Sequence, residues 1–327
     1  MVSELIPQQA HRIIVAPLNW GLGHATRCIP IIKELLEAGK EVHLASDQLA
    51  LQLLGSEFPD LTHHSLPAYN VQYKHQSLFR IMLDNGSKVL AAIKKEKQVC
   101  EQLVQEHQLD AVISDSRFGF RSEHVPSYII SHQLAPYSTN PLIKAALEKG
   151  NRSYLNKFDA VWIPDDPDHK LSGDLSKNTR IAKAHYLGPI SRLQARGITE
   201  KIYDLSLILS GPEPARTVLE QALIKELAPR IKNICLVRGT QSQAEIPPPP
   251  HWTVYDLADS KTINTVLLQS KKLLSRSGYT SIMDYYKLGV GAYLIPTPGQ
   301  SEQEYLAARL DGQHGFVHLE KLADIVA

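Results

Sequence analysis

The sequence has no excess of charge of one sign, little cysteine and no long apolar run. Lysine and arginine (35) balance aspartate and glutamate (34), and the net charge of +1 argues against a nucleic-acid-binding protein, which is normally basic. Because Cys28, Cys100 and Cys235 form no CxxC pair, we expect neither a disulfide framework nor a structural zinc site. No apolar run approaches the roughly 18–20 residues of a membrane-spanning helix, and the N-terminus lacks the pattern of a signal peptide. We therefore expect a cytoplasmic protein.

Short β-rich runs alternate with helical stretches along the whole chain. At about 150 residues per domain, a length of 327 predicts two domains. The strands predicted in the first half are Arg12–Ala16, Glu41–Ser46, Asp110–Ser114, Ser127–Ser131 and Ala160–Ile163. The helices predicted there are Ala25–Ala38 and Leu78–His107, the second broken at Asn85–Gly86. Strands separated by helices indicate a doubly wound parallel sheet, which binds ligands at the carboxyl ends of its strands.

The same alternation restarts near residue 205. The strands predicted in this half are Leu205–Leu209, Ile231–Val237, Thr253–Asp256, Leu273–Leu274 and Ala292–Ile295. The helices predicted here are Arg216–Leu227 and Thr280–Leu288. Between the halves, His185–Gly197 contains a Gly–Pro pair and scattered charge, which is typical of a linker. We predict an α/β protein with domains at 1–190 and 198–327, joined by a linker at 188–203 and facing each other across a cleft.

A glycine-containing turn follows the first predicted strand. Gly21 and Gly23 permit a tight turn, and the next helix presents free N–H groups. The dinucleotide-binding fingerprint is incomplete, because Thr26 stands where its third glycine would be. His24 lies at the start of the helix, and a helix N-terminus lowers the pKa of a histidine and favours the neutral imidazole of a general base. A capping or core histidine is the alternative.

Polar residues follow two neighbouring strands of the first half. Asp115 comes directly after Asp110–Ser114, so a parallel sheet brings its carboxylate to the same edge as His24. An aspartate hydrogen-bonded to an imidazole fixes its tautomer and supports proton abstraction, whereas an aspartate that caps the next loop is equally compatible with the sequence. The pair His132 and Gln133 follows the next strand, where an acceptor site would lie.

Two segments of the second half combine small and polar residues at strand ends. In Ser275–Asp284, small residues lead into a helix whose N-terminus could hold a diphosphate, with Asp284 within reach of a ribose diol. A helix cap would explain Ser277 alone. In Pro296–Glu304, acids and amides suit sugar hydroxyls, because a hydroxyl both donates and accepts; a polar helix start is the alternative.

Two further segments of the first half could contact a second substrate, the acceptor of a transferred group. Leu78–Lys97 is either an ordinary amphipathic helix or a patch that touches anionic lipid. Its basic residues are Arg80, Lys88, Lys94, Lys95 and Lys97. His63–His75 is predicted as a loop whose aromatic side chains could line an acceptor groove. Metal binding by His63–His64 is not expected, since adjacent residues seldom converge on one ion.

Together these motifs resemble the GT-B glycosyltransferases, and especially the MurG-like family (glycosyltransferase family 28). Gly21–His24 is similar to the N-terminal Gly-rich loop of that family, which ends in histidine. Gly188–Arg192 resembles the segment between the domains, whose arginine approaches the donor diphosphate, and Gly211–Arg216 takes the place of the second Gly-rich loop. Ser275–Asp284 with Pro296–Glu304 resembles the donor signature.

The resemblance implies two Rossmann-like domains, the first on the acceptor side and the second binding the nucleotide sugar. It implies that His24 is the catalytic base, while Asp115 resembles the aspartate that partners the base in plant and drug-metabolising UDP-glycosyltransferases. The donor-binding residues would be Gly23, Arg192, Gly211, Ser277, Gly278, Tyr279, Thr280, Asp284, Glu302, Gln303 and Glu304. The acceptor-binding residues would be Arg27, His132 and Gln133.

We expect an inverting enzyme that moves a hexose or N-acetylhexosamine from a nucleoside-diphosphate sugar, by resemblance a UDP-sugar, to an acceptor hydroxyl. The acceptor would be a lipid-linked or cell-envelope glycan, reached by peripheral contact with the inner face of the plasma membrane. Neither a metal nor a cofactor besides the UDP-sugar is expected, because no DxD-type motif is placed to serve the donor. The alternatives are a non-hydrolysing UDP-sugar epimerase and a catalytically silent nucleotide-sugar-binding subunit.

Overall fold

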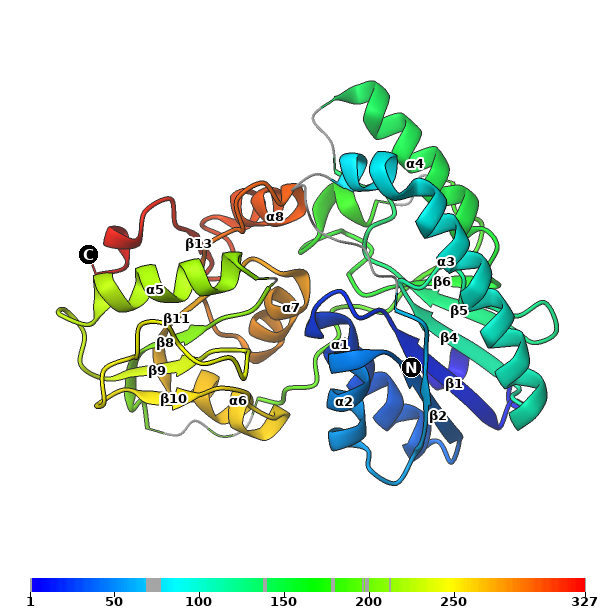
Figure 1. Ribbon diagram of the computed structural model, residues 1–327, viewed down its shortest axis with the longest axis horizontal. Coiled ribbons are helices and arrows are strands. Elements are labelled where there is room, and N and C mark those ends of the chain that lie inside the picture. Colours follow the sequence, from blue (N-terminus) through cyan, green and yellow to red (C-terminus); the bar gives the residue numbers. More distant parts are fainter. Residues whose placement is uncertain are drawn as a thin grey trace. The chain divides into compact units, whose positions relative to one another are not determined.

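The computed structural model describes residues 2–68, 78–137, 140–177, 180–195, 197, 200–211 and 213–326, with the side chains of 78–89 excepted (Figure 1). The chain divides into two compact units, Met1–Ile190 and Ser191–Ala327. This division falls inside the segment 188–203, where the sequence predicts a linker. Each unit is an α/β domain with a parallel sheet, as the alternation of strands and helices predicted.

The first unit contains a seven-stranded parallel sheet in the order β3-β2-β1-β4-β5-β6-β7. Its strands are β1 (Arg12–Pro17), β2 (Glu41–Ser46), β3 (Thr62–Ser65), β4 (Ala111–Asp115), β5 (Ser127–Ile130), β6 (Ala160–Ile163) and β7 (Ala184–Tyr186). Its helices are η1 (Val2–Leu5), α1 (Leu22–Glu37), α2 (Gln48–Glu57), α3 (Leu78–His107), α4 (Pro141–Leu155) and η2 (Gly173–Leu175).

Both faces of this sheet are covered, because successive side chains of a strand point to opposite faces. Ile13 and Val15 of β1 pack with residues of α1 and α2, whereas Ile14 and Ala16 pack on the other face with residues of α3. Figure 1 shows α1 and α2 on one side of the sheet and α3 on the other. Burial of each such isoleucine or valine stabilises the folded state by about 1.5–3 kcal/mol. Because both faces of the sheet are covered, its strands are continuous apolar runs.

The order of the strands creates a switch point beside β1. The chain passes from β1 to β2 and β3 on one side, then returns to β4 on the other side of β1. The loops that follow β1 and β4 therefore diverge from the same edge of the sheet, which is where doubly wound sheets bind ligands. His24 follows β1, and Asp115 is the last residue of β4.

The second unit repeats this plan with a six-stranded parallel sheet in the order β10-β9-β8-β11-β12-β13. Its strands are β8 (Tyr203–Ile208), β9 (Ile234–Val237), β10 (Thr253–Tyr255), β11 (Ser270–Ser275), β12 (Tyr293–Leu294) and β13 (Val317–His318). Its helices are α5 (Ala215–Leu227), α6 (Ser260–Leu268), α7 (Tyr279–Leu288), α8 (Ser301–Leu310) and η3 (Leu322–Val326). Here the switch point lies between β8 and β11, so the loops after these two strands diverge from one edge.

Three expectations for the first unit are wrong. The helix Leu78–His107 is continuous through Asn85–Gly86, because one glycine costs a helix only about 1 kcal/mol, which its other residues outweigh. His63 and His64 lie in β3 and not in a loop. His185 belongs to the edge strand β7, so the connection between the units begins after it.

Helix α8 begins inside Pro296–Glu304, where a polar helix start was the alternative. Helices α2, α4 and α6 were not predicted, although two of them carry the usual start signals. Asn140 caps α4 by accepting hydrogen bonds from Leu142 N and Ile143 N, and Asp259 caps α6 by accepting one from Thr262 N. Within the described ranges, no helix is both long enough and apolar enough to cross a membrane.

Candidate functional site

The turn between β1 and α1 positions His24. Gly21 has a φ of 86°, a backbone conformation that glycine adopts readily and residues with a side chain rarely adopt, and α1 begins at the next residue. His24 therefore lies in the first turn of α1, at the carboxyl edge of the sheet. Gly23 belongs to the same turn of the helix, where its carbonyl oxygen accepts a hydrogen bond from Thr26 Oγ1 at 3.0 Å.

His24 and Asp115 are in direct contact, as the sheet topology predicted. His24 Nδ1 lies 2.8 Å from Oδ1 of Asp115. Arg27 Nη2 lies 2.8 Å from the same nitrogen. In the tautomer that carries its hydrogen on Nδ1, this N–H donates to the carboxylate and the lone pair of the imidazole is at Nε2. The register explains the contact, because Asp115 pairs with Pro17 at the end of β1, directly before the turn that leads to His24.

Arg27 completes the contacts of Asp115. Its Nε and Nη2 donate to the two carboxylate oxygens, and Cys28 Sγ donates to Oδ2 at 3.7 Å. The exposed fractions are 0% for Asp115 and 2% for Arg27, so this ion pair is buried. Burial alone would raise the pKa of Asp115, but the positive charge of Arg27, followed by the contact with His24, outweighs it and holds this pKa well below its usual range. Asp115 is therefore a permanent carboxylate at neutral pH.

His24 is neutral at physiological pH. Burial, and after it the positive charge of Arg27, lowers the pKa of His24 from 6.5, while Asp115 opposes this shift. The sequence predicted the direction from the helix N-terminus, but the causes are burial and Arg27. With 18% of its side chain exposed, His24 remains accessible to a substrate. A neutral imidazole with Nδ1–H held by a carboxylate can take up a proton at Nε2.

Of the three residues expected to bind the acceptor, two are buried and in contact with each other and the third is half-buried. Arg27, expected to bind the acceptor, is buried as the ion partner of Asp115. His132 is also buried, with Nδ1 3.3 Å from Arg27 Nη1. Gln133 is half-buried, and its carbonyl oxygen accepts a hydrogen bond from Asn151 Nδ2 at 2.7 Å.

The sequence analysis missed two partners of this group, Cys28 and Ser116. Ser116 Oγ accepts a hydrogen bond from Arg27 Nη2 at 3.3 Å. The signal for Cys28 was available, because residues three and four positions apart share a helix face, and His24, Arg27 and Cys28 have this spacing. Burial, and after it Asp115, raises the pKa of Cys28 well above its usual value, so its thiol is a hydrogen-bond donor and not a nucleophile.

In the second unit, Asp284 on α7 contacts the segment that precedes β8. Its exposed fraction is 8%, and its Oδ1 accepts a hydrogen bond from Ser191 Oγ at 2.5 Å. Burial raises the pKa of Asp284 to about 6, although the hydrogen bond from Ser191 and the positive charge of Arg192 oppose this shift. Arg192 Nη1 donates to Ser260 Oγ at 3.3 Å, at the start of α6. The structure thus brings the predicted residues Arg192 and Asp284 near each other, together with Ser191 and Ser260, which the sequence analysis did not select.

The turn from β11 into α7 has an open N-terminus. Gly278 is the residue before the helix, it has no capping side chain, and a Cβ atom at this position would meet nothing within 4 Å. Thr280 is half-buried in the first turn, whereas Tyr279 is buried with an exposed fraction of 3%. Ser277 is fully buried, and its hydroxyl donates to the backbone oxygen of Gln303 at 2.7 Å. The hydroxyl of Ser277 therefore serves the fold, and an anion could contact only the backbone here.

The acids and amides after β12 are largely committed to the loop that contains them. Gln303, expected to bind the donor sugar, is buried, and its Oε1 accepts a hydrogen bond from Thr297 N at 2.8 Å. Glu304 is exposed, and its Oε1 accepts from Gly299 N at 2.7 Å. Glu302 is half-buried in the first turn of α8. Gly211 follows β8, is exposed and has a φ of 107°.

The remaining expectations for the acceptor fall partly outside the described residues. The side chains of Arg80 and Lys88, and the residues Tyr69, Tyr73 and His75, lie outside them. Lys94 and Lys95 are exposed on α3, whereas Lys97 forms an ion pair with Glu123.

The chain was compared with family models and with curated proteins. No family model matches the chain. Two uncharacterised glycosyltransferases of Methanosarcina acetivorans are similar to it, one 27% identical over 91% of this chain and 82% of the relative, the other 24% identical over 92% and 81%.

Solved structures match the chain over nearly its whole length. A glycotransferase of kitacinnamycin has a TM-score of 0.65 and 14% identity over 96% of this chain and 86% of its own. The spinosyn rhamnosyltransferase SpnG in complex with thymidine diphosphate has a TM-score of 0.61 and 13% identity over 94% and 86%. UGT89C1 of Arabidopsis thaliana in complex with UDP-L-rhamnose has a TM-score of 0.59 and 12% identity over 98% and 90%. The structural similarity identifies the fold as GT-B, and with the sequence similarity to the two relatives it makes the chain a glycosyltransferase.

Proposed function

We propose that the protein transfers a sugar with inversion from a nucleoside-diphosphate sugar to an acceptor hydroxyl, with His24 as the general base. The observation that carries this proposal is the 2.8 Å contact between His24 Nδ1 and Asp115 Oδ1 at the switch point of the first sheet. It leaves a neutral imidazole with its lone pair at Nε2, next to a carboxylate that can stabilise the imidazolium.

In the proposed reaction, His24 Nε2 takes the proton of the acceptor hydroxyl while the oxygen attacks the anomeric carbon of the donor. The new bond joins the acceptor oxygen to this carbon, and the bond from the carbon to the diphosphate oxygen breaks. The nucleoside diphosphate leaves with the electron pair. Attack opposite the leaving group inverts the configuration, and Asp115 stabilises the imidazolium until its proton passes to solvent.

The proposed donor site lies in the second unit. Asp284 would accept hydrogen bonds from the ribose diol, and Arg192 and the open N-terminus of α7 at Gly278 would stabilise the diphosphate without a metal. The charge of the leaving group develops on the diphosphate, so these fixed positive groups favour the transition state. Neighbours solved with thymidine diphosphate and with UDP-L-rhamnose support a nucleoside-diphosphate donor, and we propose uridine as its base.

We propose that the acceptor is a lipid-linked or cell-envelope glycan, as in the MurG-like family. SpnG has also been solved in complex with the spinosyn aglycone, which supports the binding of an acceptor molecule by a protein of this fold. The exposed Lys94 and Lys95 on α3 fit a weak contact with anionic lipid.

A panel of nucleotide sugars tests the proposal. Binding is measured by calorimetry, and release of nucleoside diphosphate is measured with and without acceptor hydroxyl compounds. Acceptor-dependent release with an inverted product supports the proposal. Conversion of the donor sugar without acceptor would instead identify an epimerase, and donor binding without turnover of any donor would identify a silent binding subunit.

The rate of transfer is expected to remain constant when the pH falls from about 8 to about 6.5 and to decrease only below that value. His24 acts as a base only when it is unprotonated, and its pKa is lowered from 6.5, so protonation needs more acid than for an ordinary histidine. The measurement is kcat at each pH with the donor saturating, which keeps protonation of Asp284 out of the profile. A rate that already falls between pH 8 and 7 would contradict the role of His24.

Asp284→Asn is expected to weaken donor binding by about 10- to 100-fold, because hydrogen bonds to a charged acceptor contribute about 1.5–3 kcal/mol. In the wild type, affinity for UDP should also decrease as the pH falls through about 6, the raised pKa of Asp284. Calorimetry with UDP at several pH values measures both effects. The matched control is Asp324→Asn, an exposed residue of the same unit, and an equal effect of both variants would contradict a ribose contact by Asp284.

A further inference from the structure

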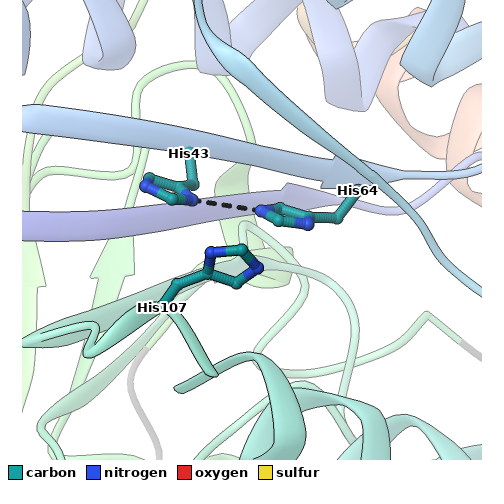
Figure 2. A group of neighbouring side chains, drawn as sticks. All are labelled: His43, His64 and His107. Atoms are coloured by element: carbon teal, nitrogen blue, oxygen red, sulfur yellow. Dashed lines mark hydrogen bonds between the residues drawn. The ribbon is translucent and has the colours of Figure 1, made fainter. Parts of the chain in front are cut away.

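Three histidines that the proposed reaction does not use meet in the first unit. His43 lies on β2, His64 on the neighbouring strand β3, and His107 is the last residue of α3. Figure 2 shows His107 approaching the other two rings, with a hydrogen bond between His43 and His64. His43 is buried, whereas His64 and His107 are half-buried, so solvent reaches one side of the group.

The nitrogen atoms of the three rings have the spacing of a metal site. One ring nitrogen from each residue lies within 4.8 Å of the others, and His43 Nδ1 and His64 Nε2 are 3.1 Å apart. Two nitrogens bound to zinc at about 2.0–2.1 Å with tetrahedral angles are about 3.4 Å apart. The group therefore needs little rearrangement to place three nitrogens around one ion.

His43 also has the outer contact that metal-binding histidines usually make. Its second ring nitrogen, Nε2, lies 3.2 Å from Oε1 of Glu41 on the same strand. A carboxylate that accepts from the distal N–H of a histidine fixes the tautomer and increases the basicity of the other nitrogen.

The tautomers are compatible with a bound ion. Since Nε2–H of His43 donates to Glu41, Nδ1 of His43 carries a lone pair, and His64 Nε2–H donates to it. When the hydrogen of His64 moves from Nε2 to Nδ1, both facing nitrogens carry a lone pair, and rotation of the rings would turn these lone pairs towards one ion.

We propose that His43, His64 and His107 bind one Zn²⁺ or a similar imidazole-preferring divalent ion, with water in the fourth position. Three imidazole nitrogens suit zinc, copper, nickel or iron, whereas magnesium and calcium prefer oxygen. The half-buried side of the group gives the ion its path of entry.

The position of the site in the fold indicates a stabilising function. His43 pairs with Ile14, whereas Asp115 pairs with Pro17, so the site lies roughly 10 Å along the strands from the catalytic edge. The ion would connect two strands at the edge of the sheet with the end of a long helix, and so link three segments far apart in sequence. It would stabilise the first unit and take no part in transfer, and this inference is therefore independent of the proposed function.

Metal binding to the full-length protein, purified without a histidine tag, tests this inference. We expect one Co²⁺ per chain with the visible absorption of a four-coordinate ion, displaced by one Zn²⁺. With zinc about a hundredfold above its dissociation constant, the midpoint of the first thermal transition should rise by about 5–10 °C. His64→Ala and His107→Ala should each weaken zinc binding by at least about a hundredfold, and Glu41→Gln by about 10- to 100-fold.

The matched control is His63→Ala. His63 precedes His64 on β3, so its side chain points to the other face of the sheet, where Nε2 donates to the backbone oxygen of Phe58 at 3.1 Å. This variant should bind zinc as the wild type does. The inference is overturned if the wild type binds zinc no more tightly than His107→Ala, or if His63→Ala loses as much affinity as His64→Ala. Circular dichroism verifies that each variant is folded, and His107→Gln replaces His107→Ala if the latter is not.

Discussion

Replacing His24 with alanine is expected to lower kcat by about 10²- to 10⁴-fold, the usual contribution of a general base. The variant keeps the loop and the helix, since alanine is tolerated in the first turn of α1, but no group remains to take the acceptor proton. The dissociation constant of the donor should be unchanged, because the proposed donor contacts belong to the second unit. Initial rates of nucleoside diphosphate release and calorimetry with UDP measure the two quantities on the same preparation.

The matched control for this experiment is His185→Ala, which removes an exposed histidine from β7 of the same unit. It should transfer sugar at the rate of the wild type. A His24→Ala variant as active as this control would show that His24 is not the base. A loss of donor affinity together with activity would instead indicate that the variant changes the fold or that His24 contacts the donor.

The contact between His24 and Asp115 could be predicted because topology alone determines it. The residues lie far apart in the sequence, but each follows or ends a strand of a parallel sheet, and the carboxyl ends of such strands share one edge. The register of β1 and β4 then fixes the spacing of the two side chains. Strand direction and strand ends were therefore sufficient to predict that these two residues lie at one edge of the sheet.

The position of Arg27 shows where this reasoning stops. Arg27 lies three residues after His24, on the same face of the helix, and was expected to bind the acceptor. The structure buries Arg27 against Asp115, because an ionised carboxylate at 0% exposure requires a partner of opposite charge. Whether a polar residue near a site contacts the ligand or a neighbouring side chain depends on burial, which the local sequence does not contain.

Ser277 and Gln303 illustrate the same difficulty in the second unit. Both lie in segments whose composition suits a donor, yet the hydroxyl of Ser277 and the amide oxygen of Gln303 are bound to backbone atoms of the fold. Loops at strand ends need such hydrogen bonds because their own backbone groups have no partners in the sheet. A polar loop residue thus has two competing uses, and only the structure distinguishes them.

The three histidines were missed for a different reason. The strand Thr62–Ser65 is short and largely exposed, so it lacks the apolar alternation that identifies strands. Without this strand, His64 has no predicted neighbour on β2, and the pairing of β2 with β3 is what brings it beside His43. His63, the neighbour of His64 in the sequence, is not part of the group, and its Nε2 donates to the backbone oxygen of Phe58.

Replacing Asp115 with asparagine is expected to destabilise the first unit by about 3–5 kcal/mol and to reduce kcat by up to about 10⁴-fold. Asparagine has the same shape but no charge, so Arg27 would remain buried without its ion partner and His24 without the carboxylate that stabilises the imidazolium. Urea unfolding at neutral pH measures the stability, and the assay used for His24→Ala measures the rate. The matched control is Asp60→Asn, an exposed residue of the same unit, which should change neither quantity.

A double variant separates the two effects of Asp115. Arg27→Met alone leaves a buried carboxylate with its main partner removed, so it should also be destabilising by about 3–5 kcal/mol. In Arg27→Met/Asp115→Asn both charges are gone, and the loss of stability should be smaller than the sum of the single losses by about 0.5–3 kcal/mol. Activity should not recover, because His24 still lacks its carboxylate partner. Strictly additive losses would mean that the pair contributes no coupling energy, and recovery of activity in the double variant would mean that Asp115 acts on the rate only through Arg27.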